Sequence, residues 1–378
     1  MEEWKTYRLG ELLQIRYGKD HKALADGPFP AYGSGGLMRS VEKPIYNKQS
    51  ILIPRKGSLN NIIYVDIPFW TVDTMFWTII DTSIVMPHYL YYALKDFDFA
   101  SLNVGSAVPS LTCPVLEAIE VPIPSLQLQR QILNCIEPID DKIALNNCIN
   151  HNLEEQAQAL YKSWFIDFEP FKDGKFVDSE LGLIPEKWSV KSLGEVTKEM
   201  RDKVGARQDV KVLSPVTSGR LVLSEEFFTK QVFSENIAKY LLVRPGDFAY
   251  NPARVNIGSL GLNEYSFDGC VSPVYVVFRC ENGYNHFFDL YRTTVPFKDE
   301  VLSRSSGGVR QTLGYKDFAL IRIVYPPKDV IDSFNSLYER LIAVQKSKIQ
   351  ENEILSSQRD ALLPLLISGQ VLCVDLNC

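Results

Sequence analysis

The chain has 378 residues, 46% of them hydrophobic and 23% charged, and a formal net charge of −6, which is typical of a globular protein with two or three domains. No apolar stretch approaches the length of a membrane-spanning helix, and the N-terminus lacks the basic and apolar run of a signal peptide. The seven cysteines form no Cys-x-x-Cys pair, which argues against disulfides and a zinc site. We therefore expect a cytoplasmic protein.

The first stretch, residues 1–125, is rich in short apolar runs separated by turn residues. These runs predict strands at 50–53, 61–65 and 76–80 and a helix at 87–94. Strands and a helix mixed in one stretch indicate an α+β domain, which we call domain 1.

A different periodicity begins at Leu126 and extends to residue 169. Apolar and asparagine side chains alternate by four and three residues, which places them on one side of a long helix. They are Ile132, Ile136, Ile139, Ile143, Asn146, Asn150, Leu153, Ala157, Leu160 and Trp164. Some 40 helical residues would span ~60 Å. Pro138 should kink this helix or delay its start.

After a linker at 170–186, residues 187–327 repeat the first stretch as domain 2. Trp4, Leu9, Gly10 and Glu11 recur 184 positions later as Trp188, Leu193, Gly194 and Glu195. Toward the end of each stretch the offset is 202, pairing Gly105, Ser110 and Leu111 with Gly307, Thr312 and Leu313. Domain 2 is thus 18 residues longer, the difference between the two offsets. Two similar domains predict pseudo-two-fold symmetry and two related ligands.

A second helical periodicity covers residues 328–370 and precedes a tail at 371–378. Pro364 and Gly369 are expected to end this helix. Asn146 and Asn150 near the centre of the first helix would meet Lys348 and Asn352 in an antiparallel coiled-coil pair, where a buried polar layer sets the register. The alternative is two separate surface helices with solvated asparagines.

Charge is distributed unevenly along the chain. Residues 126–186 carry −6, whereas residues 187–327 carry +4 and include ten arginines. Domain 2 can therefore bind phosphates, while the acidic helix would face away from them. The pI of the whole chain, near 5.5, is nevertheless low for a DNA-binding domain.

Over essentially its whole length the chain resembles the specificity subunits of type I restriction-modification systems. The resemblance depends on the duplicated order of several short motifs. They are the two Trp-x-x-x-x-Leu-Gly-Glu openings, Tyr32-Gly33-Ser34-Gly35-Gly36, Arg55-Lys56-Gly57-Ser58, Gly308-Val309-Arg310-Gln311-Thr312-Leu313, the lead-ins Val121-Pro122-Ile123-Pro124 and Val324-Tyr325-Pro326-Pro327, and Leu362-Leu363-Pro364-Leu365-Leu366-Ile367-Ser368-Gly369. Asn60 departs from the pattern, because a further glycine often follows Arg-x-Gly-x in the family.

The resemblance implies two target-recognition domains, each reading one half of a bipartite asymmetric DNA site, and two long spacer helices that dock two methyltransferase subunits. Restriction subunits, which translocate DNA with ATP and cleave it, are further candidate partners. S-adenosylmethionine, ATP and Mg²⁺ would be bound by these partners, so no cofactor or metal is expected in this chain. The chain would be a non-catalytic specificity subunit.

Residues suited to DNA contact lie in loops that follow predicted strands. Arginine and lysine suit phosphates and the O6 and N7 atoms of guanine, and asparagine or glutamine suits adenine. The candidates are Lys19, Tyr32, Arg55, Lys56 and Ser58 in domain 1, and Arg254, Asn256, Arg304, Ser305, Arg310 and Gln311 in domain 2. Charged side chains are common in solvent-exposed loops. For each single position, a solvated side chain without any DNA contact is therefore an equally good explanation.

Three patterns resemble catalytic motifs, and none is complete. Asn251-Pro252-Ala253-Arg254 lacks the second proline and the aromatic residue of adenine methyltransferases. Asp202 with Asp209-Val210-Lys211 loosely resembles a nuclease metal site. Gly33-Ser34-Gly35-Gly36 is not a phosphate-binding loop. A drifted single-chain methyltransferase or nuclease is the alternative function, and a scaffold that binds only protein is a third.

The first helix ends in an aromatic cluster. Trp164, Phe165 and Phe168 are candidates for docking a methyltransferase subunit, since the cluster is more apolar than a two-helix pair needs. The alternative is that they pack against the neighbouring domain. The bases read by each domain, and the gap between half-sites, are not encoded in any visible pattern.

Overall fold

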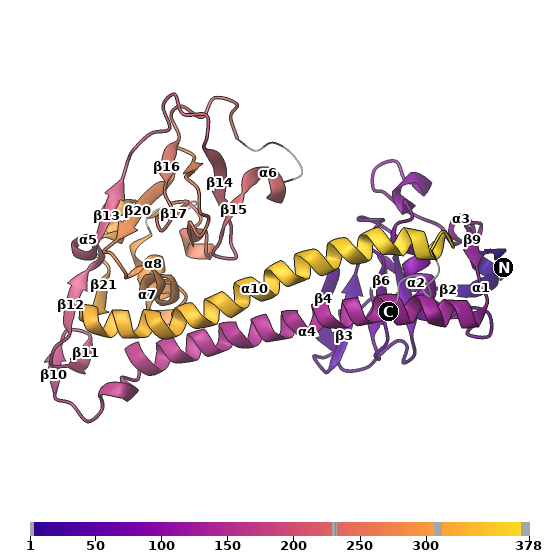
Figure 1. The fold of residues 1–378 in the computed structure, drawn as a ribbon, viewed down its shortest axis with the longest axis horizontal. Coiled ribbons are helices and arrows are strands. Elements are labelled where there is room, and N and C mark those ends of the chain that lie inside the picture. Colours follow the sequence, from indigo (N-terminus) through magenta and orange to yellow (C-terminus); the bar gives the residue numbers. More distant parts are fainter. Residues whose placement is uncertain (1–3, 229–230, 232, 306–311, 372–378) are drawn as a thin grey trace. The chain divides into compact units, whose positions relative to one another are not determined.

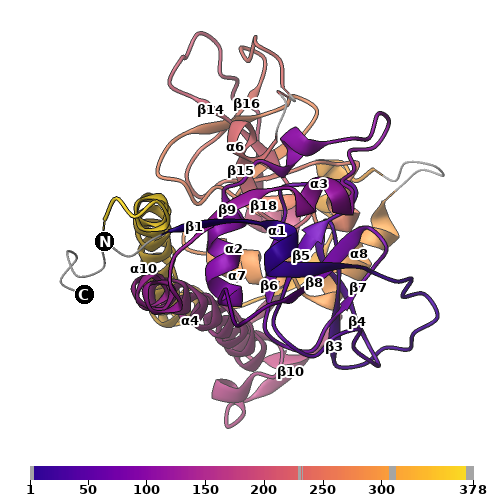
Figure 2. The same ribbon diagram turned by 90° about the vertical axis from the view of Figure 1, so that its right-hand side faces the viewer.

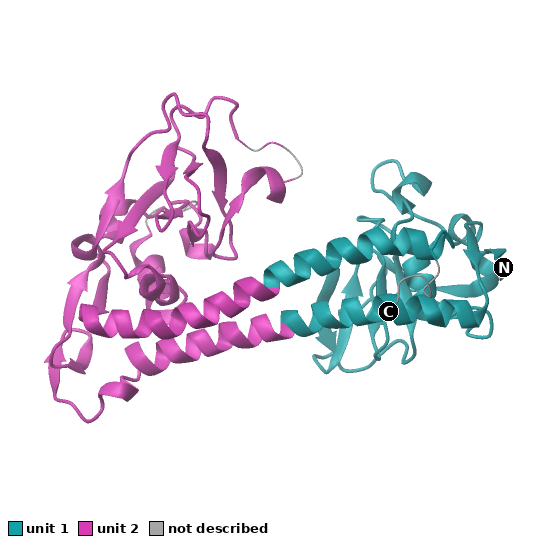
Figure 3. Ribbon diagram, in the orientation of Figure 1, with its two compact units in different colours: residues 1–147, 349–378 teal, residues 148–348 magenta. Residues whose placement is uncertain are grey.

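The computed structural model describes residues 4–228, 231, 233–305 and 312–371. The chain divides into two compact units, whose boundaries lie within the two long helices (Figure 3). Unit 1 comprises residues 1–147 and 349–378, and unit 2 comprises residues 148–348. Among the described residues, no helix combines the length and the hydropathy that crossing a membrane requires.

Unit 1 holds domain 1 and parts of both long helices. Its elements are β1 (Lys5–Arg8), α1 (Leu9–Leu12), β2 (Leu13–Tyr17), β3 (Phe29–Gly33), β4 (Gly36–Val41), β5 (Ser50–Pro54), β6 (Ile63–Val65), β7 (Trp70–Thr71), β8 (Met75–Ile80), α2 (Pro87–Lys95), η1 (Phe99–Leu102), α3 (Cys113–Glu117) and β9 (Glu120–Ile123), with the first part of α4 (Leu126–Phe165) and the last part of α10 (Lys328–Ile367).

The centre of domain 1 is β5, all of whose residues are buried. It lies between β8 and β6 in a sheet of order β2-β8-β5-β6, and α2 packs against β5 and β6 (Figure 2). A second sheet has the order β4-β3-β7, and β1 pairs with β9. The predicted α+β class and the predicted strands and helix of domain 1 are confirmed.

Unit 2 holds domain 2 and the remaining parts of the long helices. Its other elements are η2 (Glu169–Phe171), β10 (Phe176–Ser179), β11 (Gly182–Pro185), β12 (Ser189–Ser192), α5 (Leu193–Val196), β13 (Thr197–Met200), β14 (Lys211–Pro215), β15 (Leu221–Leu223), α6 (Ser224–Phe227), β16 (Leu241–Val243), β17 (Phe248–Tyr250), η3 (Val255–Ile257), β18 (Leu260–Leu262), β19 (Gly269–Val271), β20 (Val276–Cys280), α7 (Asn285–Tyr291), α8 (Val295–Arg304), α9 (Tyr315–Phe318) and β21 (Arg322–Tyr325).

The two domains share one strand topology. The order β13-β20-β17-β18 in domain 2 repeats β2-β8-β5-β6, and the pair β12-β21 repeats β1-β9. The second sheet, β15-β14-β19-β16, repeats β4-β3-β7, including the parallel pairing of its central strands, and adds β16. The additional strand lies in the longer part of domain 2 that the two sequence offsets predicted.

The repeated Leu-Gly-Glu motif has the same packing role in both domains. The Leu9 N–H donates to the Ile119 carbonyl at 2.7 Å, and the Leu193 N–H donates to the Ile321 carbonyl at 2.8 Å. The following glycine permits a close approach, because a Cβ atom at Gly10 or Gly194 would lie 3.0 Å from the Cβ atom of Glu117 in α3 or of Ala319 after α9, respectively. The glutamate then accepts a hydrogen bond from the backbone N–H three residues earlier, which caps the short helix.

The long helices α4 and α10 each contribute to both units (Figures 1 and 3). Pro138 does not delay the start of α4, which begins at Leu126 and continues through this proline. Pro364 does not end α10 by itself, because the helix continues to Ile367. Both prolines are exposed, so water can hydrate the carbonyl that loses its helical partner, while buried neighbours such as Ile136 and Leu363 hold the helix in place. Gly369, with a φ of 70°, follows the end of α10.

A polar layer joins the two helices within unit 1. Asn146 is fully buried, and its Nδ2 donates to Asn352 Oδ1 at 2.9 Å and to Glu351 Oε2 at 3.1 Å. Asn352 Nδ2 in turn donates to Asn147 Oδ1 at 2.9 Å. Asn150 and Lys348 lie one helical turn away in unit 2, where Asn150 Oδ1 is buried and has no hydrogen-bond partner among the residues that the structure describes. A polar contact of this kind disfavours a shifted register, because the shift would bury the amide against apolar side chains.

Candidate nucleic-acid interface

The loop that follows β5 carries the main candidates of domain 1. The Arg55 carbonyl accepts from Leu111 N–H at 2.9 Å, and Gly57 N–H donates to the Pro109 carbonyl at 3.0 Å. Gly57 has a φ of 93°, which favours glycine, and it turns the loop so that Lys56 and Ser58 are exposed. The backbone of this loop is therefore held in one conformation, with its polar side chains outside.

The side chain of Arg55 lies over an exposed tyrosine. Its guanidinium carbon is 5.7 Å from the ring centroid of Tyr17, which is 56% exposed. Arg55 Nε is buried without a hydrogen-bond partner, and no carboxylate of the described residues forms an ion pair with this arginine. A hydrogen bond from Cys113 Sγ to the hydroxyl raises the pKa of Tyr17, so this hydroxyl stays neutral near pH 7. The charge of Arg55 is consequently available to an anion.

The other candidates of domain 1 differ in accessibility. Lys19 is exposed, and its backbone N–H donates to the Thr71 carbonyl at 2.9 Å. Tyr32 is partly buried and packs against the core around Leu52, so it is less suited to DNA contact than predicted. The turn between β3 and β4 reaches the segment that follows the β5 loop, because Asn61 Nδ2 donates to the Ser34 carbonyl at 2.9 Å.

Domain 2 places a loop at the equivalent position after β17. The Pro252 carbonyl accepts from Leu313 N–H at 3.1 Å, as the Arg55 carbonyl does from Leu111. Arg254 is exposed and directly precedes η3, in which Asn256 lines a cavity of about 220 Å³. Thr217, Arg292 and Lys298 also line this cavity, together with apolar side chains such as Phe297 and Val301, so its wall is mixed.

Ion pairing separates the ten arginines of residues 187–327 into two groups. Seven form an ion pair with a carboxylate: Arg201, Arg207, Arg244, Arg279, Arg292, Arg304 and Arg322. Arg310 lies outside the described residues. Arg220 and Arg254 are exposed and form no ion pair with any residue that the structure describes. Their charge is not neutralised within the described part of the protein, so these two are the best suited to bind phosphate or guanine.

Arg220 and Arg254 lie on loops that one serine connects. Ser259 N–H donates to the Arg254 carbonyl at 3.1 Å, and Ser259 Oγ donates to the Pro215 carbonyl at 2.6 Å. The Arg220 carbonyl accepts from Val216 N–H at 3.0 Å, which closes the turn between β14 and β15. Arg220 and Tyr17 are not among the residues predicted from the sequence, although the polar turn Thr217-Ser218-Gly219-Arg220 indicates an exposed arginine.

The remaining candidates of domain 2 are less favourable or lie elsewhere. Arg304 Nε donates to Glu300 Oε2 at 2.7 Å, and Ser305 Oγ donates to the Val301 carbonyl at 2.6 Å. Both side chains therefore already have a partner at the end of α8. Arg310 and Gln311 lie outside the described residues, so their role stays a prediction.

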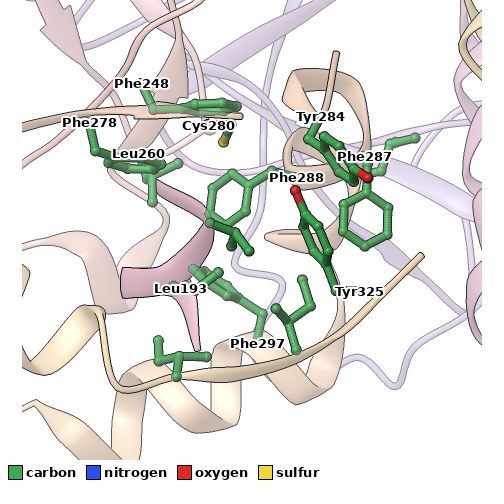
Figure 4. Close-up of a cluster of buried hydrophobic side chains, with 14 of the residues drawn as sticks. Leu193, Phe248, Leu260, Phe278, Cys280, Tyr284, Phe287, Phe288, Phe297 and Tyr325 are labelled. Atoms are coloured by element: carbon green, nitrogen blue, oxygen red, sulfur yellow. The ribbon is translucent and has the colours of Figure 1, made fainter. Parts of the chain in front are cut away.

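The aromatic cluster at the end of α4 belongs to the core of unit 2. Phe165 is 6% exposed, and its ring contacts Trp188, Phe287 and Phe334 at centroid distances of 5.9, 4.9 and 4.8 Å. This burial contradicts the assignment of Phe165 as a docking residue and supports the alternative, packing against domain 2. Figure 4 shows part of this core around Phe287, Tyr284 and Tyr325.

Trp164 and Phe168, the other two docking candidates, are half-buried. The ring of Trp164 contacts Phe334, and the ring of Phe168 contacts Trp188 at 5.3 Å between centroids. They pack against the same rings as Phe165, because Phe334 in α10 and Trp188 in domain 2 also contact Phe165. Part of each side chain therefore stays exposed.

The motifs that resemble catalytic sites have structural roles. Asp202 forms an ion pair with Arg244, and Arg207 forms one with Asp209 that lowers the pKa of this carboxyl. Asn251 Oδ1 accepts from the Ala253 N–H at 3.0 Å in a local turn. Among the described residues, no group of three or more histidine, cysteine, aspartate or glutamate side chains converges as metal ligands would.

The known proteins that this chain resembles are specificity subunits of type I restriction systems. Residues 1–155 match the family described as type I restriction modification DNA specificity domain. The specificity subunit of the type I restriction enzyme MjaIX from Methanocaldococcus jannaschii is 26% identical over 348 residues, which are 86% of this chain and 78% of that protein. The HindI specificity subunit from Haemophilus influenzae is 29% identical over 196 residues, 46% of this chain and 43% of that protein.

A solved structure resembles the whole fold. The S subunit of a type I restriction-modification system from M. genitalium has a TM-score of 0.60 at 15% identity, covering 97% of this chain and 96% of that one. This similarity extends to both domains and both long helices, so the architecture described above is shared beyond domain 1.

Proposed function

We propose that the chain is a type I specificity subunit and recognises a bipartite asymmetric DNA site, one half with each domain. The proposal is supported by the match of residues 1–155 to the type I DNA specificity family and by the similarity of 86% of the chain to a type I specificity subunit. One observation carries this proposal: the two domains share a scaffold but hold different side chains at equivalent loops. The carbonyls of Arg55 and Pro252 occupy the same position relative to Leu111 and Leu313. Lys56-Gly57-Ser58 follows the first carbonyl, whereas Ala253-Arg254-Val255 follows the second. Different side chains on one scaffold suit two different half-sites.

The domain boundaries of this proposal follow the sequence repeat. Residues 1–125 and 187–327 would be the target-recognition domains, residues 126–169 and 328–370 the spacer helices, residues 170–186 a linker and residues 371–378 a tail. DNA contacts are proposed for Lys19, Arg55, Lys56 and Ser58 in the first domain, and for Arg220, Arg254 and Asn256 in the second. Arg310 and Gln311 remain proposed contacts of the second domain.

The chemistry is proposed to reside in partner subunits. Two methyltransferase subunits would bind S-adenosylmethionine, and restriction subunits, where present, would use ATP and Mg²⁺. We expect the purified chain alone neither to bind S-adenosylmethionine nor to methylate DNA, and the complex with methyltransferase subunits to do both. Calorimetric titration and transfer of a labelled methyl group measure the two properties. Reproducible methylation by the chain alone would instead support the alternative, a single-chain enzyme.

The long helices are proposed to set the gap between the half-sites. Adding seven residues to α4 after Asn150 and seven to α10 before Lys348 keeps the heptad pattern and lengthens both helices by ~10 Å. Since successive base pairs are ~3.4 Å apart, we expect the preferred gap to grow by about three base pairs. Methylation of a library of split sites by the reconstituted complex measures this gap.

The matched control for the longer helices is an insertion of seven residues at Gly174, in the exposed linker before β10. This insertion leaves both helices unchanged, so the preferred gap should stay the same. If the longer helices change the bases preferred but not their spacing, the assignment of spacing to the helices is wrong. A chain that binds only protein would show no sequence preference in any of these complexes.

A further inference from the structure

The loop between η1 and α3 exposes two valines beside the cationic β5 loop. Val104 is 55% exposed and Val108 is 54% exposed, although valine is more often found inside a protein. They flank Gly105-Ser106-Ala107, so the loop presents an apolar surface at its tip. We call residues 103–110 the valine loop.

One asparagine side chain holds the valine loop in shape. Asn103 Oδ1 accepts from the backbone N–H groups of Gly105 and Ser110, both at 2.8 Å, and its Nδ2 donates to the Gly105 carbonyl at 3.0 Å. The Val104 N–H donates to the Ser110 carbonyl at 3.0 Å, which closes the base of the loop. A Cβ atom at Gly105 would lie 2.1 Å from the Val108 carbonyl oxygen, so the chain is tightly folded between the two valines.

The valine loop is also fixed to its surroundings at both ends. At the start, Asn60 Oδ1 accepts from the Ala100 N–H at 2.8 Å, which ties η1 to the segment after the β5 loop. At the end, Gly57 N–H donates to the Pro109 carbonyl, and Lys56 pairs with Ser110 in an isolated antiparallel bridge. The two valines therefore lie beside the exposed Lys56 in a loop whose conformation is already fixed. The loop loses little conformational entropy when a ligand binds to it.

We propose that Val104 and Val108 contact the 5-methyl group of thymine in the half-site read by domain 1. The thymine methyl is the apolar group that base pairs present in the major groove, and apolar side chains recognise it there. Lys56 and Arg55 would hold the adjacent phosphates and bring the loop to the bases. This inference depends on the proposed function and adds one specific feature of the base sequence to it.

Deoxyuridine tests the proposal because it lacks only the 5-methyl group. In the reconstituted methyltransferase complex, we expect replacement of the contacted thymine by deoxyuridine to weaken binding of the wild-type chain roughly fourfold, the effect of one buried methyl group. The double substitution Val104→Ser and Val108→Ser removes the methyl groups of both valines, so it should weaken binding to thymine DNA and reduce the difference between thymine and deoxyuridine to less than about twofold. Val177→Ser, a change of an exposed valine in β10, is the matched control and should keep the difference.

The proposal would be overturned by the absence of a deoxyuridine effect in the half-site of domain 1, by an effect that the double substitution leaves unchanged, or by a half-site without an A·T pair. Weaker assembly with the methyltransferase subunits would assign the valines to a protein interface instead. Failure of the proposed function is distinguishable, because the wild-type complex would then show no sequence preference on ordinary DNA. Unchanged thermal unfolding of the double variant checks that it is folded.

Discussion

Replacing Arg220 and Arg254 together by alanine is expected to abolish recognition of the half-site read by domain 2 and to spare the other half. Both arginines are exposed and have no carboxylate partner among the described residues, so they can bind DNA without first breaking an ion pair. The loss of a bidentate contact to a base costs ~1–3 kcal/mol, so two lost contacts weaken binding by a factor of roughly thirty to twenty thousand. Methylation of a split-site library by the reconstituted complex measures both halves separately.

Arg201→Ala is the matched control for this double substitution. Arg201 is also exposed, with 78% of its side chain accessible, but it forms an ion pair with Glu199 at 2.8 Å. We expect a small effect, because its charge is already compensated. If the double variant weakens binding equally on all sequences and lowers the salt dependence, Arg220 and Arg254 contact phosphates only. Equal relaxation of both half-sites would contradict the assignment of one half-site to each domain.

Replacing Phe165 by alanine is expected to lower the free energy of unfolding of unit 2 by about 3–5 kcal/mol, the usual cost of removing a buried phenylalanine. Phe165 is 6% exposed and contacts the rings of Trp188 before β12, Phe287 in α7 and Phe334 in α10. Urea unfolding followed by circular dichroism measures the change.

The neighbouring Ile166 supplies the control, because it is 46% exposed. Ile166→Ala should shift the unfolding midpoint far less than Phe165→Ala. If Phe165→Ala leaves the unfolding midpoint unchanged but abolishes binding of the methyltransferase subunits, Phe165 belongs to the subunit interface and not to the core.

The repeat of the two domains could be predicted because its motifs act locally. Leu9-Gly10-Glu11 and Leu193-Gly194-Glu195 cap short helices and pack closely on a neighbouring helix, so the same residues are needed twice. The positions of Arg55 and Arg254 after buried strands could also be predicted, because a charged residue after an apolar run indicates where a buried strand ends. The continuity of α4 and α10 through Pro138 and Pro364 could not be predicted. The sequence does not show that the carbonyl group left without its helical hydrogen bond faces water.

The α+β class, the duplication, the two long helices and the loops that carry the candidate contacts could be predicted from the sequence, because each depends on residues close together in the chain or on a repeated offset. Which candidate side chains and which arginines of domain 2 are available to a ligand depends on tertiary contacts. Phe165 is covered by Phe287 and Phe334, which are distant in the sequence, and Arg279 is paired with Asp247 at 2.6 Å across neighbouring strands. Burial and ion pairing depend on which distant side chains the fold brings together, and no local pattern contains that information.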